Sequence, residues 1–472
     1  TWKNGELNDH LYLVENTNFS KKDNSFGCAT EEELALMFSY ADGYKKFLNV
    51  AKTEREAVRA AVKLAEEHGY KPFRFGDTVR PGDQLYYNNR GKNLFLIRVG
   101  SAPIETAGVK ILAAHIDSPR LDLKQCPVYE DSQMCFLKTH YYGGIKKYQW
   151  TAIPLALHGT IVRADGEEIT VCVGEDENDP IFYINDLLPH LAQKQSREPL
   201  GEAIPGEALN VLVGGMPVAG EDGDAIKLNV LRILNEKYGI TEDDFLSAEI
   251  SAVPAMKARD VGFDRSLIAA YGHDDRVCSY PAFTALFDAT DRTNTVIVVL
   301  ADKEEIGSEG NTGMQSVVLD DILNELSLAA GANPRIVRAA SACLSADVTA
   351  AYDPNFKEVY EKANSSLLSC GTALCKYTGA RGKSGSNDAS AEFVGRIRRI
   401  FANGHVAWQS SELGKVDAGG GGTVAKFISK MNIDTVDIGV PVLSMHAPYE
   451  VVSKADLYAT YKAFVAFIDA CN

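Results

Sequence analysis

Short, almost wholly apolar runs separated by helical stretches are the feature that most constrains the fold of this chain. Strands that are apolar on both faces are typical of a mostly parallel sheet covered by helices on both sides. Helical stretches such as 280–290 and 320–331 alternate with these runs. We therefore predict an α/β/α domain with a mostly parallel central sheet. The predicted strands are NLFLIRVG (93–100), VKILAAHID (109–117), TVIVVLAD (295–302) and VPVLSM (440–445).

The middle of the chain, from about 119 to 258, follows a different pattern. It contains short β-like runs broken by Gly, Asp and Pro, such as 159–174, and a helical stretch at 224–239. A length of 472 residues is more than one ordinary core accommodates. We predict a β-rich domain at 119–258, inserted into a domain that is formed by 1–118 and 259–472.

Two capping-box patterns predict where helices begin near the N-terminus. Thr30 is followed by Glu33, and Thr53 by Glu56, each before a periodic apolar run. The prediction is helical structure over residues 30–70.

Charge and cysteine content narrow the class of protein. The formal net charge of −16 argues against a nucleic-acid or anionic-membrane partner. The nine cysteines are an odd number and form no CxxC pair, which favours reduced thiols over disulfides. The first twenty residues lack a signal-peptide pattern, and no apolar run is long enough to span a bilayer. We expect a soluble, cytoplasmic protein.

Residue types that bind metals end four predicted apolar strands, namely three of those above and IVRAASACLSAD (336–347), and a pair of aspartates begins a predicted helix. Ligands of open α/β sheets bind outside the carboxyl ends of the strands. We therefore expect these side chains to meet in one cleft. They are His115 and Asp117, Glu304 and Glu305, Asp347, His446, and the pair Asp274 and Asp275.

This set of side chains suits particular metals and a particular reaction. Two histidines and several carboxylates without cysteine favour Zn²⁺, Mn²⁺ or Co²⁺. The number of acids suggests more than one ion, and a carboxylate can bridge two metals about 3.5–4 Å apart. One acid must stay free to accept a proton from an activated water. The adjacent Glu304 and Glu305 can divide these two tasks.

Each of these residues also has an ordinary structural explanation. A single histidine at a strand end is usually a packed or hydrogen-bonded side chain. An Asp-Asp pair at a helix start is usually an N-cap with a favourable dipole interaction. Adjacent glutamates after a strand usually form a solvated turn. The pattern alone leaves these alternatives open beside a metal site.

At these residues the sequence resembles the aspartyl aminopeptidase / aminopeptidase I family of dinuclear zinc exopeptidases, in its bacterial form. The resemblance spans most of the chain and implies a metallo-aminopeptidase that removes the N-terminal residue of peptides. The motifs that carry it are AAHIDSPRLDLK (113–124), HDDR (273–276), DKEEIGSEG (302–310), SADVTAAYDPNF (345–356) and MHAPYE (445–450).

The resemblance implies two divalent ions per subunit, Zn²⁺ with Mn²⁺ or Co²⁺ as alternatives. The implied ligands are His115, Asp274 and Asp347 for one ion, and Asp274, Glu305 and His446 for the other.

The resemblance also assigns the remaining roles. Glu304 is implied as the general base, and Asp117 as the residue that orients His115. Asp274 is chosen over Asp275 because the family's bridging acid is the first of the pair.

Family architecture implies how the chain assembles. The metallopeptidase domain is interrupted after its first His-x-Asp by a β-rich domain used in dimerisation, which is where the composition changes here. Related enzymes form tetrahedral dodecamers, so we expect a closed homo-oligomer built from dimers. Its other partners would be peptides with a free N-terminus.

Three further residues are candidates for substrate binding. Lys376 lies where the family places a lysine near an acidic substrate side chain, although a solvated lysine fits equally well. Asp417, before a glycine-rich stretch, could pair with a substrate amine or cap a helix, and His190 could reach a neighbouring subunit or be structural. Ala350 replaces a histidine that is typical of eukaryotic aspartyl enzymes, so the preferred N-terminal residue stays open.

Two other functions remain compatible with the sequence. Another di-metal amide hydrolase, such as an N-acyl amino-acid deacylase, would use the same ligands. A catalytically silent assembly protein could also be built on this fold.

Overall fold

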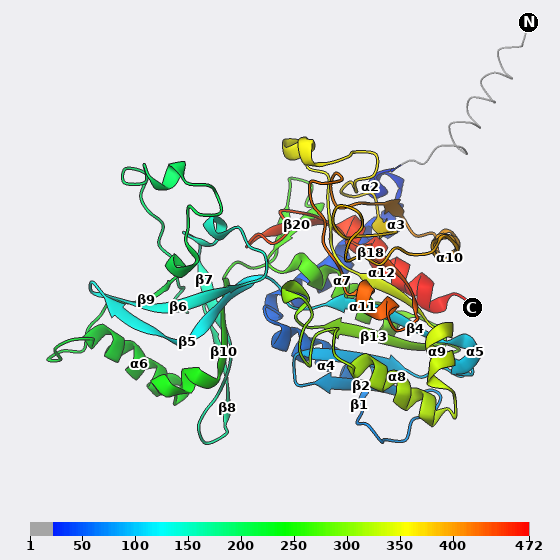
Figure 1. Cartoon of the computed structure of the whole chain (residues 1–472), viewed down its shortest axis with the longest axis horizontal. Helices are drawn as coiled ribbons and strands as arrows, with labels where there is room; N and C mark the ends of the chain where they lie inside the picture. The colour runs from blue at the N-terminus through cyan, green and yellow to red at the C-terminus, as the bar shows by residue number, and fades with distance from the viewer. Residues whose placement is uncertain (1–21, 472) are drawn as a thin grey trace, which may run out of the picture.

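A computed structural model describes residues 22–471 of the chain. The first twenty residues, for which we predicted no signal peptide, lie outside the described residues. Within them, no helix is both long and apolar enough to cross a membrane. All nine cysteines are free thiols, as predicted. Figure 1 shows a large α/β body and a smaller β-rich lobe beside it.

A nine-stranded sheet forms the centre of the large body. Five of its eight neighbour pairings are parallel, which confirms the predicted mostly parallel sheet. In spatial order its strands are β1 (Lys71–Pro72), β2 (Gln84–Asn89), β3 (Asn93–Arg98), β13 (Thr295–Ala301), β4 (Val109–His115), β14 (Ala342–Ala346), β18 (Asp434–Gly439), β16 (Thr372–Cys375) and β17 (Trp408–Ser410).

Helices cover both faces of this sheet. Successive residues of a strand point to opposite sides, and the central strands are buried along their whole length, so both sides need covering. On β4, Leu112 packs on one face and Ile111 on the other. The first face is covered by α3 (Glu31–Val50), α4 (Glu54–Glu67), α7 (His273–Asp288), α10 (Ala391–Asn403) and α12 (Lys454–Asp469). The second is covered by α5 (Ile104–Ala107), α8 (Val318–Ala329), α9 (Pro334–Ala340) and α11 (Ala425–Ser429).

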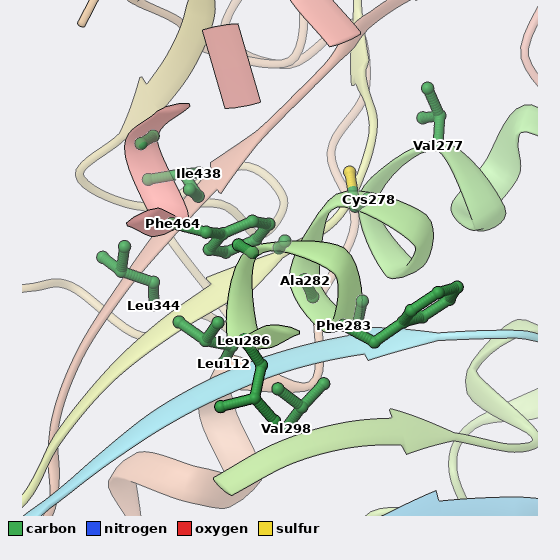
Figure 2. Packing of buried hydrophobic residues seen from close by; sticks show 14 of the residues in the cluster. Leu112, Val277, Cys278, Ala282, Phe283, Leu286, Val298, Leu344, Ile438 and Phe464 are labelled. Carbon is green, nitrogen blue, oxygen red and sulfur yellow. The ribbon is translucent and has the colours of Figure 1, made fainter. Parts of the chain in front are cut away.

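Packing on the first face is shown in Figure 2. There Ala282 and Leu286 of α7 lie over Leu112 and Val298 of the sheet, with Phe464 of α12 beside them. The capping boxes predicted at Thr30 and Thr53 are present at the starts of α3 and α4. A short helix, α2 (Ser25–Cys28), precedes them.

The smaller lobe in Figure 1 is an antiparallel sheet of six strands that is formed entirely by residues between 120 and 254. Its helix α6 (Ala225–Tyr238) matches the predicted helical stretch at 224–239. The predicted β run at 159–174 forms the hairpin of β7 and β8. In spatial order the strands are β8 (Glu168–Val173), β7 (Leu155–Val162), β10 (Ala248–Pro254), β5 (Arg120–Asp131), β6 (Met134–Tyr142) and β9 (Val211–Gly214).

A third sheet corrects one part of the prediction. The run 440–445 does not join the central sheet; its strand β19 belongs to a separate five-stranded sheet. The chain leaves the central sheet at Gly439, where a Cβ atom would lie 1.6 Å from the carbonyl oxygen of Asp347. The strands of the third sheet are, in order, β11 (Arg259–Val261), β12 (Leu267–Ala270), β20 (Glu450–Ser453), β19 (Pro441–Leu443) and β15 (Thr349–Ala350).

Candidate metal centre

His115 is the last residue of the buried strand β4, and its ring is fixed from one side. Its Nδ1 lies 3.2 Å from Oδ1 of Asp117 and 3.1 Å from the carbonyl oxygen of the same residue. Its Nε2 points the other way, 3.1 Å from Oδ1 of Asp274 and 3.5 Å from Oδ1 of Asp347. The ring is 1% exposed, so it presents one nitrogen to a cluster of carboxylates out of contact with bulk water.

Asp274 lies between the two histidines. Its Oδ1 is 3.1 Å from Nε2 of His115, and its Oδ2 is 3.1 Å from Nε2 of His446. The backbone of Asp274 and Asp275 is not helical although both residues begin α7. The neighbouring Asp275 instead accepts a hydrogen bond from the backbone N–H of His115, at 3.3 Å. The two aspartates therefore have different surroundings.

The adjacent glutamates lie in a single 3₁₀ turn, Glu304–Ile306, directly after β13. Because the strand has ended, the two side chains need not point to opposite faces of the sheet. Their backbone N–H groups donate to the two oxygens of Asp117, at 3.1 Å each. Oε2 of Glu305 lies 3.4 Å from Nε2 of His446. Asp117 thus fixes both this turn and the first histidine.

The remaining two side chains of the cluster, those of Asp347 and His446, come from loops that follow β14 and β19. Asp347 follows β14 and its backbone N–H donates to Ile438. His446 has a left-handed backbone with φ +66° and is 31% exposed, far more than His115. Its backbone N–H donates to Oε1 of Glu450 at 2.8 Å, and its Nδ1 lies 2.7 Å from the carbonyl oxygen of Gly144.

The cluster carries more negative charge than its histidines can balance. Burial and the charge of Asp347 raise the pKa of Glu304 to about 8. Burial also raises the pKa of Asp347. Burial opposes protonation of His446, but Asp274 and Glu305 raise its pKa to about 10. Cations bound among these groups would relieve this repulsion.

The unpaired atoms of the cluster fit a metal. Nε2 of His115, Oδ1 of Asp274 and Oε1 of Glu305 are buried and have no hydrogen-bond partner. Ligand atoms of these three residues lie within 4.8 Å of one another, and so do those of His115, Glu304 and Asp347. Imidazole nitrogen and carboxylate oxygen are ordinary ligands of zinc. The residues therefore suit a divalent-cation site.

A cavity of about 350 Å³ opens onto this cluster. Asp274, Glu304, Glu305, Asp347 and His446 all line it. The rest of its wall combines apolar side chains and glycine backbone with the polar residues Thr349, Tyr377, Thr378, Thr423 and Asp437. The apolar and glycine residues include Val348, Leu413, Ile438, Met445 and Gly420, Gly421 and Gly422.

The three predicted substrate-binding residues lie outside this lining. Lys376 is 45% exposed, and its Nζ pairs with Oδ1 of Asp388 at 2.8 Å. Asp417 is exposed, with φ +67°. His190 is exposed in the β-rich lobe. The structure brings the seven predicted metal and catalytic residues together, but not these three.

Sequence reasoning missed three residues that contact the cluster. Glu450 accepts from the backbone N–H groups of both Asp274 and His446. It lies in the MHAPYE motif, so that motif could have indicated it. Tyr142 and Gly144 belong to the segment YYGGI, which carries no recognisable metal-binding signal.

Comparison with known proteins identifies the family. The model of the aminopeptidase I zinc metalloproteases (M18) matches residues 47–468. The chain belongs to this family. It is 49% identical over 448 residues to a probable M18 family aminopeptidase 1 of Clostridium acetobutylicum, covering 93% of this chain and 96% of that protein.

Solved M18 structures agree with this assignment. The crystal structure of an M18 family aminopeptidase from Thermotoga maritima superposes with a TM-score of 0.91 at 43% identity, covering 96% of this chain and all of that one. Aminopeptidase I from C. acetobutylicum gives 0.90 at 44% identity, with coverage of 96% and 100%. The chain is thus an aminopeptidase of a zinc metalloprotease family, a hydrolase that acts as an exopeptidase. The deacylase and silent-scaffold alternatives are not favoured.

Proposed function

We propose that this aminopeptidase works through two divalent ions that share Asp274. The observation that carries the proposal is that each carboxylate oxygen of Asp274 lies 3.1 Å from Nε2 of a different histidine. The geometry supports one ion between His115, Asp274 and Asp347, and a second between Asp274, Glu305 and His446. Zinc is the family metal, with Mn²⁺ and Co²⁺ as alternatives.

Bound ions would polarise the scissile carbonyl and lower the pKa of the attacking water. Glu304 would accept the proton of that water and then donate it to the leaving amine. Both glutamates line the cavity, but Glu304 is 17% exposed, whereas Glu305 is 4% exposed and lies 3.4 Å from Nε2 of His446, which supports the base role for Glu304. Asp117 would hold the turn and His115 in position through its four hydrogen bonds to them.

The cavity supports a preference for apolar N-terminal residues. Its wall includes Val348, Leu413, Ile438 and Met445. Lys376, the predicted partner of an acidic side chain, is paired with Asp388 instead. A leucine or methionine side chain would bury apolar surface here, whereas an aspartate would have to lose its hydration.

The other two substrate contacts stay predictions. An acidic group near the free amine of a peptide would suit Asp417, although its side chain is exposed. His190 would serve a neighbouring subunit's pocket, as its exposed position in the β-rich lobe allows.

We further propose that residues 119–258 form a dimerisation domain and that dimers build a tetrahedral dodecamer. Large apolar side chains are exposed over this region, namely Ile181, Leu187, Leu188, Leu191, Leu200 and Met216. Such exposure is typical of a surface that meets another chain. A structure described as an S. cerevisiae mApe1 dodecamer shares the fold with a TM-score of 0.73 at 21% identity. The free thiols support a cytoplasmic location.

The experiment that tests the proposed chemistry compares two substitutions of adjacent residues. Glu304→Gln should abolish turnover yet leave two zinc ions per subunit, whereas Glu305→Gln should lower the zinc content. Leucyl- and N-acetyl-leucyl-anilides should be assayed side by side, since only an aminopeptidase requires the free amine. A near-normal rate in Glu304→Gln, or equal cleavage of both substrates, would overturn the proposal.

A further inference from the structure

One short segment of the β-rich lobe touches both halves of the candidate metal centre. Tyr142, Gly143 and Gly144 are here called the YGG segment; Tyr142 is the last residue of β6 in the six-stranded sheet, and the two glycines follow it. The proposed ligands, in contrast, all come from the large body: His115 ends β4, Asp274 lies at the start of α7, and the others follow strands of the other two sheets. The segment therefore connects the inserted lobe to the reaction site.

The carbonyl oxygen of Gly144 determines how His446 can act. It lies 2.7 Å from Nδ1 of that histidine. A carbonyl oxygen can only accept a hydrogen bond, so Nδ1 must carry the proton. When the ring is neutral, the free lone pair is therefore on Nε2, and it is Nε2 that faces Asp274 and Glu305. The lobe thus selects the tautomer that can bind a metal.

The hydroxyl of Tyr142 acts on the other half. It donates to Oδ2 of Asp117 at 2.8 Å. Asp117 in turn contacts Nδ1 of His115 and accepts the backbone N–H groups of Glu304 and Glu305. One hydroxyl from the lobe therefore fixes the carboxylate that orients a histidine and the glutamate turn.

The ring of Tyr142 is itself held by a cation–π contact with Arg120. The guanidinium of Arg120 lies 4.1 Å from the centre of its ring. Arg120 is bound by Oε2 of Glu54 at 2.9 Å and by Oδ1 of Asp122 at 2.8 Å. Glu54 belongs to α4 of the large body, whereas Arg120 and Asp122 belong to β5 of the lobe. The hydroxyl is placed by contacts from both parts of the molecule.

Gly143 allows the segment to pass this close. Its φ is +76°, in the region that favours glycine. A Cβ atom there would lie 3.4 Å from Cβ and Oε2 of Glu305 and from Cβ of Pro119. These distances are ordinary van der Waals contacts, so the positive φ, rather than a clash, is what favours glycine where the segment packs against Glu305.

We propose that the YGG segment is a positioning element of the metal centre, which presets His446 through Gly144 and His115 through Tyr142 and Asp117. The inserted lobe then contributes to metal binding within its own chain, in addition to any role in assembly. This inference rests on the proposed ligand assignment. Outer hydrogen-bond partners of metal ligands typically change affinity by about 10–100-fold.

The test is Tyr142→Phe, which removes the hydroxyl and keeps the ring over Arg120. Zinc affinity of the metal-stripped protein is measured by chelator competition, independently of turnover. The expected result is a 10–100-fold weaker zinc affinity and an altered d–d absorption spectrum of the Co²⁺-loaded protein. Tyr141→Phe is the matched control, because it removes a hydroxyl from the adjacent tyrosine, which is 43% exposed. It should leave both measurements unchanged.

A second variant tests the His446 side. Gly143→Ala should weaken zinc binding and change the Co²⁺ spectrum while circular dichroism stays that of the folded protein. If Tyr142→Phe and Gly143→Ala both bind zinc within twofold of wild type, the YGG segment is not a positioning element. Asp274→Asn separates the two hypotheses. If it also binds zinc like wild type, the ligand assignment itself is wrong.

Discussion

The two histidines of the candidate metal centre are held in different ways. His115 ends a central strand, is 1% exposed, and is fixed by a residue two positions further along its own chain. His446 lies on a loop of a different sheet, is 31% exposed, and is fixed by a backbone carbonyl more than three hundred residues away. The first half of the site is local and buried, whereas the second half depends on tertiary contacts. We expect the two halves to differ in how firmly they retain an ion.

Replacing Asp274, the proposed shared ligand, should weaken ion binding in both halves of the site and so have the largest effect on zinc content and activity. Asp274→Asn weakens both proposed ligand sets at once, so zinc content should fall towards zero and activity by more than the roughly 100-fold typical of an outer partner. Zinc per subunit is measured by mass spectrometry of the metal. Asp288→Asn, at the far end of the same helix, is the control and should retain zinc. Full zinc content in Asp274→Asn would contradict the shared ligand.

Separating the base from the ligand should have the next largest effect. Glu304→Gln should lower kcat by about 10²–10⁴-fold with the zinc content unchanged, because it removes only proton transfer. Its neighbour Glu305→Gln should lower occupancy, and added zinc should partly restore its rate. Steady-state kinetics at several zinc concentrations distinguish the two. A rate in Glu304→Gln that recovers with zinc would show that the roles are exchanged.

The exposed half should lose its ion first. During dialysis against a chelator, zinc should leave in a fast and a slow phase, because solvent reaches His446 more easily than His115. His446→Ala should remove the fast phase and keep the slow one. A single phase in wild type, or loss of the slow phase in His446→Ala, would show that the halves do not differ in this way.

The smallest effect concerns the junction that holds the inserted lobe beside the site. His158 of β7 lies 2.8 Å from Oε1 of Glu56 on α4 and 2.9 Å from Oε1 of Glu175. Burial opposes its protonation, but hydrogen bonds with Cys172, Glu175 and Glu56 raise the pKa of His158 to about 11. The same contacts lower the pKa of the two glutamates.

The sign of the pH dependence follows from these directions. The folded pKa of His158 lies above its ordinary value of 6.5, so its contribution to stability is complete below pH 6.5 and is lost as the pH rises towards 11. The glutamates contribute above pH 4.5. His158→Gln should therefore lower Tm at pH 6.5 by a few degrees and by less at pH 9.5, since 1 kcal/mol shifts Tm by about 2–4 °C. An equal loss at both pH values would contradict the ion pairs.

Sequence reasoning worked where structure is local. Apolar runs of strand length identified β3, β4 and β13, because burial on both faces leaves a continuous apolar pattern. The predicted strand 336–347 was wrong in its first part, which ends helix α9, and only Ala342–Ala346 forms β14. The ends of β4, β13 and β14 then marked side chains that the structure gathers around Asp274. The capping boxes at Thr30 and Thr53 succeeded for the same reason, since each is completed within four residues.

It failed where contacts cross between sheets. Strand pattern could not show that the run ending before His446 leaves the central sheet, because an apolar strand looks the same in either sheet. Tyr142 and Gly144 escaped notice since their partners lie in other parts of the fold. A backbone carbonyl, moreover, has no residue type that a motif could record.

The wide spacing of the proposed ligands along the chain has a consequence for biosynthesis. His115, Asp274, Glu305, Asp347 and His446 are scattered, and the last of them is made long after the first. A nascent chain that has not reached residue 446 cannot complete the site. If the proposed ligands are right, removal of N-terminal residues by this protein is therefore deferred until nearly the whole chain has been made.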